Sequence, residues 1–262
     1  MLNIFKFFVI FIYISTCFKS FSMEEIKLST SEWSPYIGEE LHEKGLIAKI
    51  VQKALELEGY KLNLVFMPWA RAVNEAQTGK DGLDGYLPEY YDKSKEEYFE
   101  FSDPFLDSDV GFLINEKNKT KFNINIDKNN LSKSYEKLVN FRFGVVRGYI
   151  NEEYFDKITF LKKIESTSDE KNLILLDQGK VDIVVIDKNV ANYYKRNSPD
   201  LLLSKNQLIF INPPIKSHKL FIAWSKLASN FKDKNRIFNS GLKKLLDSGE
   251  YSKIIKFYQN IQ

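Results

Sequence analysis

Residues that could hold a small polar solute are concentrated in one stretch of about forty residues. The stretch begins at Pro68-Trp-Ala-Arg71, continues through a glycine-rich turn at 79–85, and ends at Phe101-Ser-Asp-Pro-Phe105. An indole ring can stack on an organic group or bind a cation, and a guanidinium can bind an anion. Arg71 falls in the first turn of an expected helix, where a cation opposes the helix dipole and a bound anion would offset the misfit. This stretch favours a binding site before it favours an enzyme.

Residue types that metal, nucleotide or nucleophilic chemistry needs are sparse. The sequence has two histidines, His42 and His218, and it contains no His-Glu-x-x-His, Gly-x-Ser-x-Gly or phosphate-binding glycine pattern. We therefore expect no cofactor and no metal ion. Acid–base chemistry by carboxylates stays open, because Glu89 and Asp187 could face each other across a dry crevice.

The first 22 residues are typical of an export signal. Lys6 precedes the apolar run 7–14, which is too short for a membrane span of about 20 residues, and small and polar residues follow it. We expect cleavage after Ser22. Lipidation at Cys17, which follows a weak match to a lipoprotein box, is the alternative. A chain cut after Ser22 has no cysteine, so its core alone must hold it together in an oxidising compartment.

The charge balance argues against nucleic acid as a partner. The whole chain carries a formal charge of +3, and cleavage after Ser22 would remove Lys6 and Lys19 and no acid, which leaves +1. About 240 residues then remain, enough for one large domain or two modest lobes.

Strand and helix patterns alternate along the chain, and their order recurs after about a hundred residues. The segments Gln77-Thr-Gly-Lys-Asp81 and Gln178-Gly-Lys-Val-Asp182 mark the two copies, and the Asn- and Lys-rich segment 117–133 between them is expected to be a solvated excursion. The order predicts two similar α/β lobes with mostly parallel sheets rather than one continuous sheet. Strands are expected at 26–30, 61–66, 83–87, 141–146, 181–186 and 220–223, and helices at 45–58, 70–77, 171–177, 237–246 and 251–261.

In open α/β sheets, ligands bind beyond the carboxyl ends of the parallel strands. That rule gathers one set of side chains at an expected crevice: Trp33, Tyr36, Trp69, Arg71, Pro88, Glu89, Tyr90, Arg147, Gly148 and Asp187. Ordinary structural roles are the alternatives. The aromatic rings could pack in the core or on a lobe surface, Arg71 could be a solvated helix charge, and Asp187 could cap a helix that begins near Asn189.

Seven patterns, taken in order, cover nearly all of residues 24–260. They are Trp33-x-Pro-Tyr36, Pro68-Trp-Ala-Arg71, Gly79 to Asp84, Phe101-Ser-Asp-Pro-Phe105, Phe143-Gly-Val-Val-x-Gly148, Gly179-Lys-Val-Asp182 through Asp187, and Phe238-Asn-x-Gly-Leu242 through Gly249-Glu-Tyr251. In these patterns the chain resembles the family 3 bacterial extracellular solute-binding proteins, the receptors of ABC importers for polar amino acids and related solutes.

The resemblance implies an α/β, two-lobed clamp of type II with two crossover strands, near 110–114 and 219–223. Lobe I would combine residues 23–112 and 221–262, and lobe II would comprise residues 113–220. Solute contacts to both lobes would favour the closed form. The resemblance also implies a periplasmic monomer that binds a small-molecule solute and has an inner-membrane ABC permease as its partner.

Only some of the positions that contact the solute in the family carry the matching residue type in this sequence. Lys95 stands where amino-acid binders have an arginine that forks onto the solute carboxylate, and a lysine cannot make that bidentate pair. Tyr149 and Ile150 replace small hydroxyl residues, whereas Asp187 matches the acid that receives the solute ammonium. The mixture argues against a standard α-amino acid. The expected ligand-binding residues are Trp33, Tyr36, Trp69, Arg71, Glu89, Tyr90, Lys95, Phe105, Arg147, Tyr149 and Asp187.

We therefore expect a receptor that delivers a small polar or zwitterionic solute to a permease. Trp33, Tyr36 and Trp69 would stack on the solute or hold a cationic group, the arginines would bind its anionic end, and Asp187 would bind its amine. One alternative is a periplasmic dehydratase of the cyclohexadienyl type, with Glu89 as its acid. The other is a sensory receptor that passes its closed state to a separate membrane kinase.

Overall fold

A computed structural model describes residues 23–122, 124–127 and 129–261. Ser22 and Cys17 lie outside the described residues, so cleavage and lipidation stay predictions. Within the described ranges, no helix has both the length and the apolar character needed to cross a bilayer.

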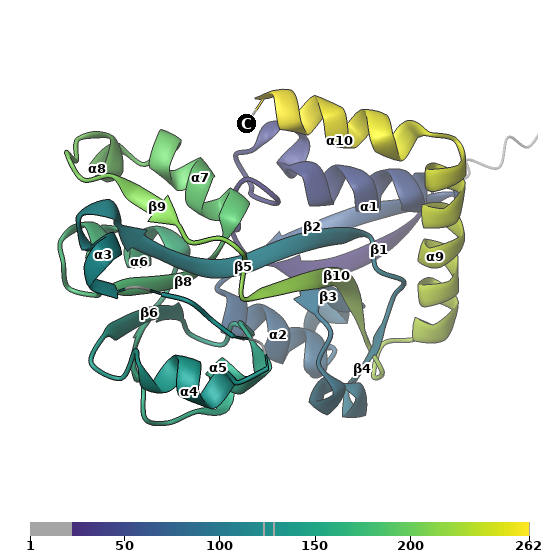
Figure 1. Cartoon of the computed structure of the whole chain (residues 1–262). Helices are drawn as coiled ribbons and strands as arrows, with labels where there is room; N and C mark the ends of the chain where they lie inside the picture. The colour runs from purple at the N-terminus through teal and green to yellow at the C-terminus, as the bar shows by residue number, and fades with distance from the viewer. Residues whose placement is uncertain (1–22, 123, 128, 262) are drawn as a thin grey trace, which may run out of the picture.

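The first half of the molecule is a parallel sheet between helices (Figure 1). Strand β1 (Glu24–Thr30) pairs in parallel with β2 (Tyr60–Phe66) on one side and with β3 (Gly85–Tyr90) on the other. Helices α1 (Leu46–Glu56) and α2 (Trp69–Gln77) connect these strands. In α1 the apolar positions recur at helical spacing, so one face is fully buried: Ile47, Ile50, Val51, Ala54 and Leu55.

The second half repeats this plan. Strand β6 (Arg142–Val146) pairs in parallel with β7 (Lys162–Ser166) and with β8 (Ile183–Asp187), which is buried along its whole length. The helices of this half are α3 (Lys119–Phe122), α4 (Leu131–Glu136), α5 (Glu153–Lys157), α6 (Asp169–Asp177), α7 (Lys188–Asn197) and α8 (Pro199–Leu202).

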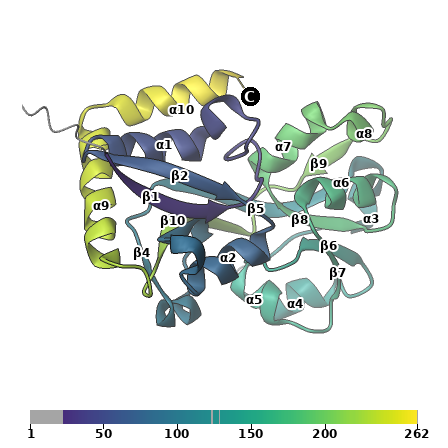
Figure 2. The same ribbon diagram turned by 180° about the vertical axis from the view of Figure 1, so that it is seen from behind.

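Two long strands run between the halves, β5 (Leu106–Asn115) and β10 (Lys216–Ser225) (Figure 2). They join all the longer strands into one sheet with the order β2-β1-β3-β10-β5-β8-β6-β7. Short strands β4 (Phe99–Phe101) and β9 (Leu208–Phe210) pair with β10 and β5 at its sides. The expectation of two separate sheets was therefore wrong, because antiparallel pairing through β5 and β10 makes the hydrogen-bonded ladder continuous.

The pairing between β5 and β10 starts before the expected crossover segments. Residues 106–110 pair with 216–220, whereas 110–114 pair with β8. The segment shared by the two halves is therefore displaced by a few residues toward the start of each strand.

The segment 117–133 is not the fully solvated excursion that its composition suggested. Helix α3 (Lys119–Phe122) lies within it, and the buried ring of Phe122 packs on Phe141 with ring centroids 4.4 Å apart. Short 3₁₀ turns occupy His42–Lys44, Lys80–Gly82, Lys93–Glu97 and Glu116–Asn118.

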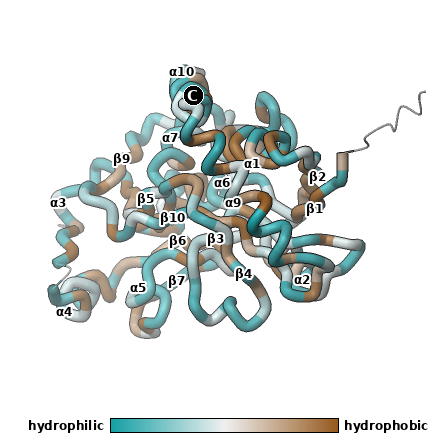
Figure 3. Tube along the Cα trace, turned by 90° about the vertical axis from the view of Figure 1, so that its right-hand side faces the viewer, coloured by the Kyte–Doolittle hydropathy of each residue, from teal (hydrophilic) through white to brown (hydrophobic). Residues whose placement is uncertain are grey.

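The closing helices α9 (Phe231–Asp247) and α10 (Glu250–Ile261) return to the first half, and α9 packs against α1. A Cβ atom on Gly241 of α9 would lie only 1.9 Å from the carbonyl oxygen of Ala54, so glycine is required for this approach. Figure 3 shows hydrophobic stretches along β1 and β2.

A buried ion pair secures α9 to the first half. The ammonium group of Lys234 lies 2.6 Å from Oδ1 of Asp84, and Oδ2 of Asp84 accepts the backbone N–H of Lys27 at 2.9 Å. Removing one partner would leave a buried charge without its counterion, which costs about 3–5 kcal/mol.

We predict that Lys234→Met lowers the free energy of unfolding by about 3–5 kcal/mol. The matched control Lys232→Met changes an exposed lysine two residues earlier and should stay within about 0.5 kcal/mol of the parent. Urea unfolding at pH 7 measures both. Equal stability of the two variants would contradict the structural role of the Lys234–Asp84 pair.

Candidate functional site

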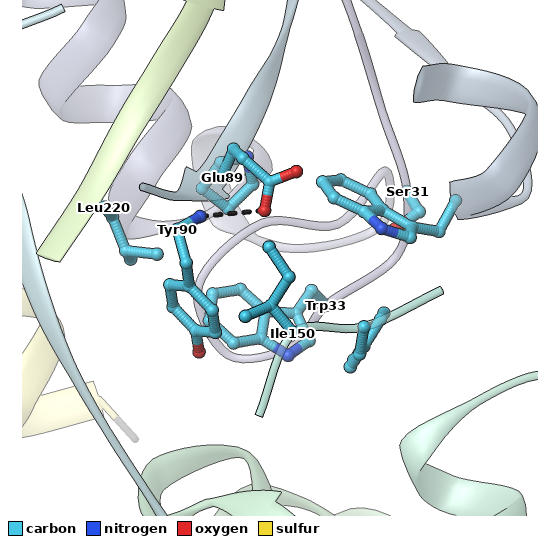
Figure 4. Close-up of a pocket in the computed structure, with 9 residues that line it drawn as sticks. Ser31, Trp33, Glu89, Tyr90, Ile150 and Leu220 are labelled. Atoms are coloured by element: carbon cyan, nitrogen blue, oxygen red, sulfur yellow. Dashed lines mark hydrogen bonds between the residues drawn. The ribbon is translucent and has the colours of Figure 1, made fainter. Parts of the chain in front are cut away.

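A cavity opens where the strand ends of the first half meet the loop after β6 in the second half (Figure 4). About 380 Å³ of space lies between the surrounding atoms, and this volume includes space that is open to solvent. Nine residues line it: Ser31, Trp33, Trp69, Pro88, Glu89, Tyr90, Tyr149, Ile150 and Leu220.

Strand β3 brings three of these residues to the cavity directly. Pro88, Glu89 and Tyr90 were expected to follow a strand at 83–87, but β3 extends from Gly85 to Tyr90 and contains them. Because the backbone at Glu89 and Tyr90 is paired with β10, these side chains are held more rigidly than loop residues would be.

Two aromatic side chains reach the cavity from the ends of other elements. Trp33 lies in a turn after β1 that is closed by a hydrogen bond of 2.8 Å from its own N–H to the carbonyl oxygen of Ile37. Trp69 is the first residue of α2, and its ring meets Tyr149 of the other half edge to face, with ring centroids 6.2 Å apart. One part of the cavity wall is therefore a direct aromatic contact between the halves.

The carboxylate of Glu89 is the charged group of the lining, and its oxygens are fully engaged. The hydroxyl of Tyr86 donates to Oε2 at 2.7 Å, the N–H of Tyr90 donates to Oε1 at 2.8 Å, and Lys95 forms a salt bridge with Oε2. Lys95 also donates to the Tyr86 hydroxyl at 3.3 Å. Its ammonium group is therefore committed to Glu89 behind the cavity wall.

Asp187 caps a helix, which was the structural alternative to a ligand contact, and it also hydrogen-bonds to the first half. Its Oδ1 accepts the N–H groups of Asn189 at 2.7 Å and Val190 at 3.0 Å, which caps α7. Its Oδ2 accepts hydroxyl groups from Ser108 at 2.7 Å and from Tyr36 at 3.2 Å. Burial raises the pKa of Asp187, and these four hydrogen bonds partly offset that rise. The role of Asp187 as a solute contact stays a prediction.

The sequence did not point to Asp169, a second buried carboxyl group beside the cavity. Burial, and then the nearby charge of Asp187, raise the pKa of Asp169 to about 7, although hydrogen bonds with Tyr149 and Trp33 act in the opposite direction. Both partners line the cavity. The sequence places Asp169 in the first turn of α6, directly after the capping residue Ser168. This position could not single it out, because acidic residues are common at the start of helices.

Other expected residues lie away from the cavity lining. Arg71 is exposed on α2, and Arg147 has a side chain that is 68% exposed and paired with Glu165 at 2.8 Å. Phe105 is buried in the core against Phe238 and does not line the cavity, so its role as a ligand contact stays a prediction.

The structure therefore brings part of the predicted set together. Tyr36 lies behind the lining, stacked on Trp33 with ring centroids 4.6 Å apart. Of the expected residues, the cavity is lined by Trp33, Trp69, Glu89, Tyr90 and Tyr149, but not by Tyr36, Arg71, Lys95, Phe105, Arg147 and Asp187. Ser31 and Leu220 line it without having been singled out. In the described ranges, no cluster of three or more His, Cys, Asp or Glu side chains could hold a metal ion.

The molecule is similar to solved structures of amino-acid-binding proteins. A mutant of ArgBP from T. maritima has a TM-score of 0.70 at 19% sequence identity, over 90% of this chain and 95% of that one. The amino acid ABC transporter substrate-binding protein AbpA from Streptococcus pneumoniae, bound to L-arginine, has a TM-score of 0.68 at 18% sequence identity, over 89% of this chain and 94% of that one. An ancestral amino-acid-binding protein described as a precursor of cyclohexadienyl dehydratase also has a TM-score of 0.68 at 18% sequence identity, over 89% of this chain and 94% of that one.

No protein-family model matches the chain, and no curated protein matches it. The structural similarity establishes the fold, a two-lobed mixed α/β clamp of the periplasmic-binding-protein type. The expected fold class is therefore confirmed.

The raised pKa of Asp169 predicts how stability depends on pH. The folded protein keeps this proton up to about pH 7, whereas an unfolded aspartate loses it near pH 4, so stability falls as pH rises between those values. Asp169→Asn removes the effect. The free energy of unfolding of the variant minus that of the parent should therefore be about 3 kcal/mol larger at pH 8 than at pH 5.

Urea unfolding at the two pH values measures this difference. Asp200→Asn, at an exposed position in the first turn of α8, should shift stability equally at both. A pH-independent effect of Asp169→Asn would show that Asp169 is already ionised at pH 5 in the folded protein.

Proposed function

We propose that this chain is an exported solute-binding protein, whose two lobes close on a small polar solute that is then passed to an inner-membrane ABC permease. The observation that carries the proposal is the composition of the cavity wall. Trp33, Trp69 and Glu89 come from the first half, and Tyr149 and Ile150 come from the second. A solute there touches both halves at once.

Contacts behind the cavity explain why closure would be coupled to binding. The hydroxyl of Tyr36 in the first half donates to Asp187 in the second, and the side-chain amide of Asn189 donates to the same hydroxyl at 2.9 Å. These bonds exist only when the halves meet. A solute that adds contacts to both halves stabilises the closed form by its differential affinity for that form.

The proposed lobes are residues 23–112 with 221–262, and residues 113–220. The antiparallel pairing of 106–110 with 216–220 supports a hinge close to these boundaries. We further propose a periplasmic monomer, with the signal peptide expected at residues 1–22. The printed descriptions of ArgBP and AbpA support the transport role by analogy of fold.

A dehydratase of the cyclohexadienyl type is the second candidate, because Glu89 lines the cavity and one similar structure is described as a dehydratase precursor. A general acid must carry a proton that it can donate. In this cavity Glu89 instead accepts hydrogen bonds from Tyr86, Tyr90 and Lys95, an arrangement that suits binding better than proton transfer. A sensory receptor for a separate membrane kinase would use the same closure.

Calorimetric titration of residues 23–262 with amino acids, polyamines and organic acids tests the proposal. We predict that at least one compound binds and is recovered chemically unchanged by mass spectrometry. Trp69→Leu should weaken that binding roughly 5- to 30-fold, because it removes an aromatic wall of the cavity. Tyr98→Leu, which changes an aromatic residue that is exposed elsewhere, is the control and should bind like the parent.

Two results would contradict a solute-binding role. One is the absence of binding across the whole panel. The other is turnover of prephenate or arogenate followed by absorbance, which would favour the dehydratase.

A further inference from the structure

We infer that the cavity selects an organic cation without a carboxylate group, an amine or a quaternary ammonium compound, over a zwitterionic amino acid. The inference rests on the proposed solute-binding function and specifies its solute class. Three features of the site carry it: the ring geometry of the walls, the charge of the lining, and the acids behind the walls.

The walls present aromatic rings in several orientations. Trp33 and Tyr90 lie nearly perpendicular, with an interplanar angle of 77° and ring centroids 6.4 Å apart. Trp69 and Tyr149 cross at 84°. The four rings line one cavity, and Figure 4 shows those of Trp33 and Tyr90 close to Glu89. Rings that surround a site from different directions are the arrangement that holds alkylammonium groups through cation–π attraction.

The lining carries negative and not positive charge. Among the nine lining residues of the described chain, Glu89 is the charged one, and none is a lysine, arginine or histidine. Lys95 stands behind Glu89, where its ammonium group is held by that carboxylate and by Tyr86. Lys95, which stands at the position expected to bind a solute carboxylate, therefore already forms a salt bridge with Glu89.

Two more acids lie directly behind the aromatic walls. Asp169 hydrogen-bonds with the lining side chains Trp33 and Tyr149. Asp187 accepts the hydroxyl of Tyr36, whose ring stacks on Trp33. Within the described residues neither acid forms a salt bridge. Low-dielectric walls focus the field of such acids into the cavity.

A solute carboxylate would consequently find no free counterion here. Arg71 and Arg147 are exposed outside the lining, and Arg147 already pairs with Glu165. The carboxylate would instead approach Glu89 and the field of Asp169 and Asp187. A cation without a carboxylate keeps the attraction of the acids and the rings and avoids this repulsion.

Three matched pairs of compounds isolate the carboxylate: agmatine with L-arginine, cadaverine with L-lysine, and choline with glycine betaine. Titration calorimetry of residues 23–262 at pH 7.5 and constant ionic strength measures each Kd. In at least one pair, we expect the carboxylate-free member to bind and to have a Kd at least about tenfold below that of its partner.

Two substitutions test whether Glu89 and Lys95 set this preference. Glu89→Gln removes the lining charge and frees Lys95, so the preference within each pair should shrink or reverse. Lys95→Met leaves Glu89 without its counterion, so the preferred cation should bind more tightly. Asp233→Asn breaks an exposed ion pair with Arg236 on α9, outside the cavity, and its Kd ratios should match those of the parent. Circular dichroism and thermal melts check that each variant is folded.

The possible outcomes separate the inference from the proposed function. If L-arginine, L-lysine or glycine betaine binds more tightly than its carboxylate-free partner, the cation assignment is overturned and the solute-binding function stands. If none of the six compounds binds, the cation assignment also fails, and the wider panel above decides the function. Unchanged ratios in both Glu89→Gln and Lys95→Met would overturn the role given to these two residues.

Discussion

The antiparallel pairing of β5 with β10 is the constraint on which the rest of the molecule depends. These strands carry the chain from the first half to the second and back, and they pair through residues 106–110 and 216–220. The same segments contact the site. Ser108 of β5 accepts the hydroxyl of Tyr90 at 2.6 Å and donates its own to Asp187, and His218 of β10 stacks on Tyr90 with ring centroids 4.1 Å apart. A change in the angle between the halves must therefore alter the contacts around the cavity.

Buried charge gives the site its chemical character. Glu89 is balanced by Lys95, but Asp169 and Asp187 are both buried, and the charge of Asp187 adds to burial in raising the pKa of Asp169. Hydrogen bonds from Tyr36, Ser108 and Tyr149 make this burial tolerable without supplying a positive charge. A protein that keeps unbalanced acids beside an aromatic cavity is suited to a partner that supplies positive charge.

The sequence predicted those features that have a local cause. Helix α1 was recognisable because Ile47, Ile50 and Val51 recur at helical spacing, and the strands of the parallel units were found within a few residues, except β7, whose mostly exposed sequence gave no strand signal. The continuous sheet was not predictable, because β5 and β10 are about 110 residues apart and their pairing leaves no periodic signal. The spacing also predicted that Arg71 lies at the start of a helix. It could not show that the side chain of Trp69, and not that of Arg71, faces the cavity. The pairing of Lys95 with Glu89 depends on the turn between them, which local patterns do not determine.

The central claim is that the two lobes close on a solute, and the distance between them measures this most directly. A chain of residues 23–262 contains no cysteine, so Lys80→Cys and Glu165→Cys, at exposed positions on opposite halves, can carry a pair of spin labels. Double electron–electron resonance should give a broad distance distribution without solute and a shorter, narrower one at saturation with the compound that binds best in calorimetry. Identical distributions at saturation would contradict closure.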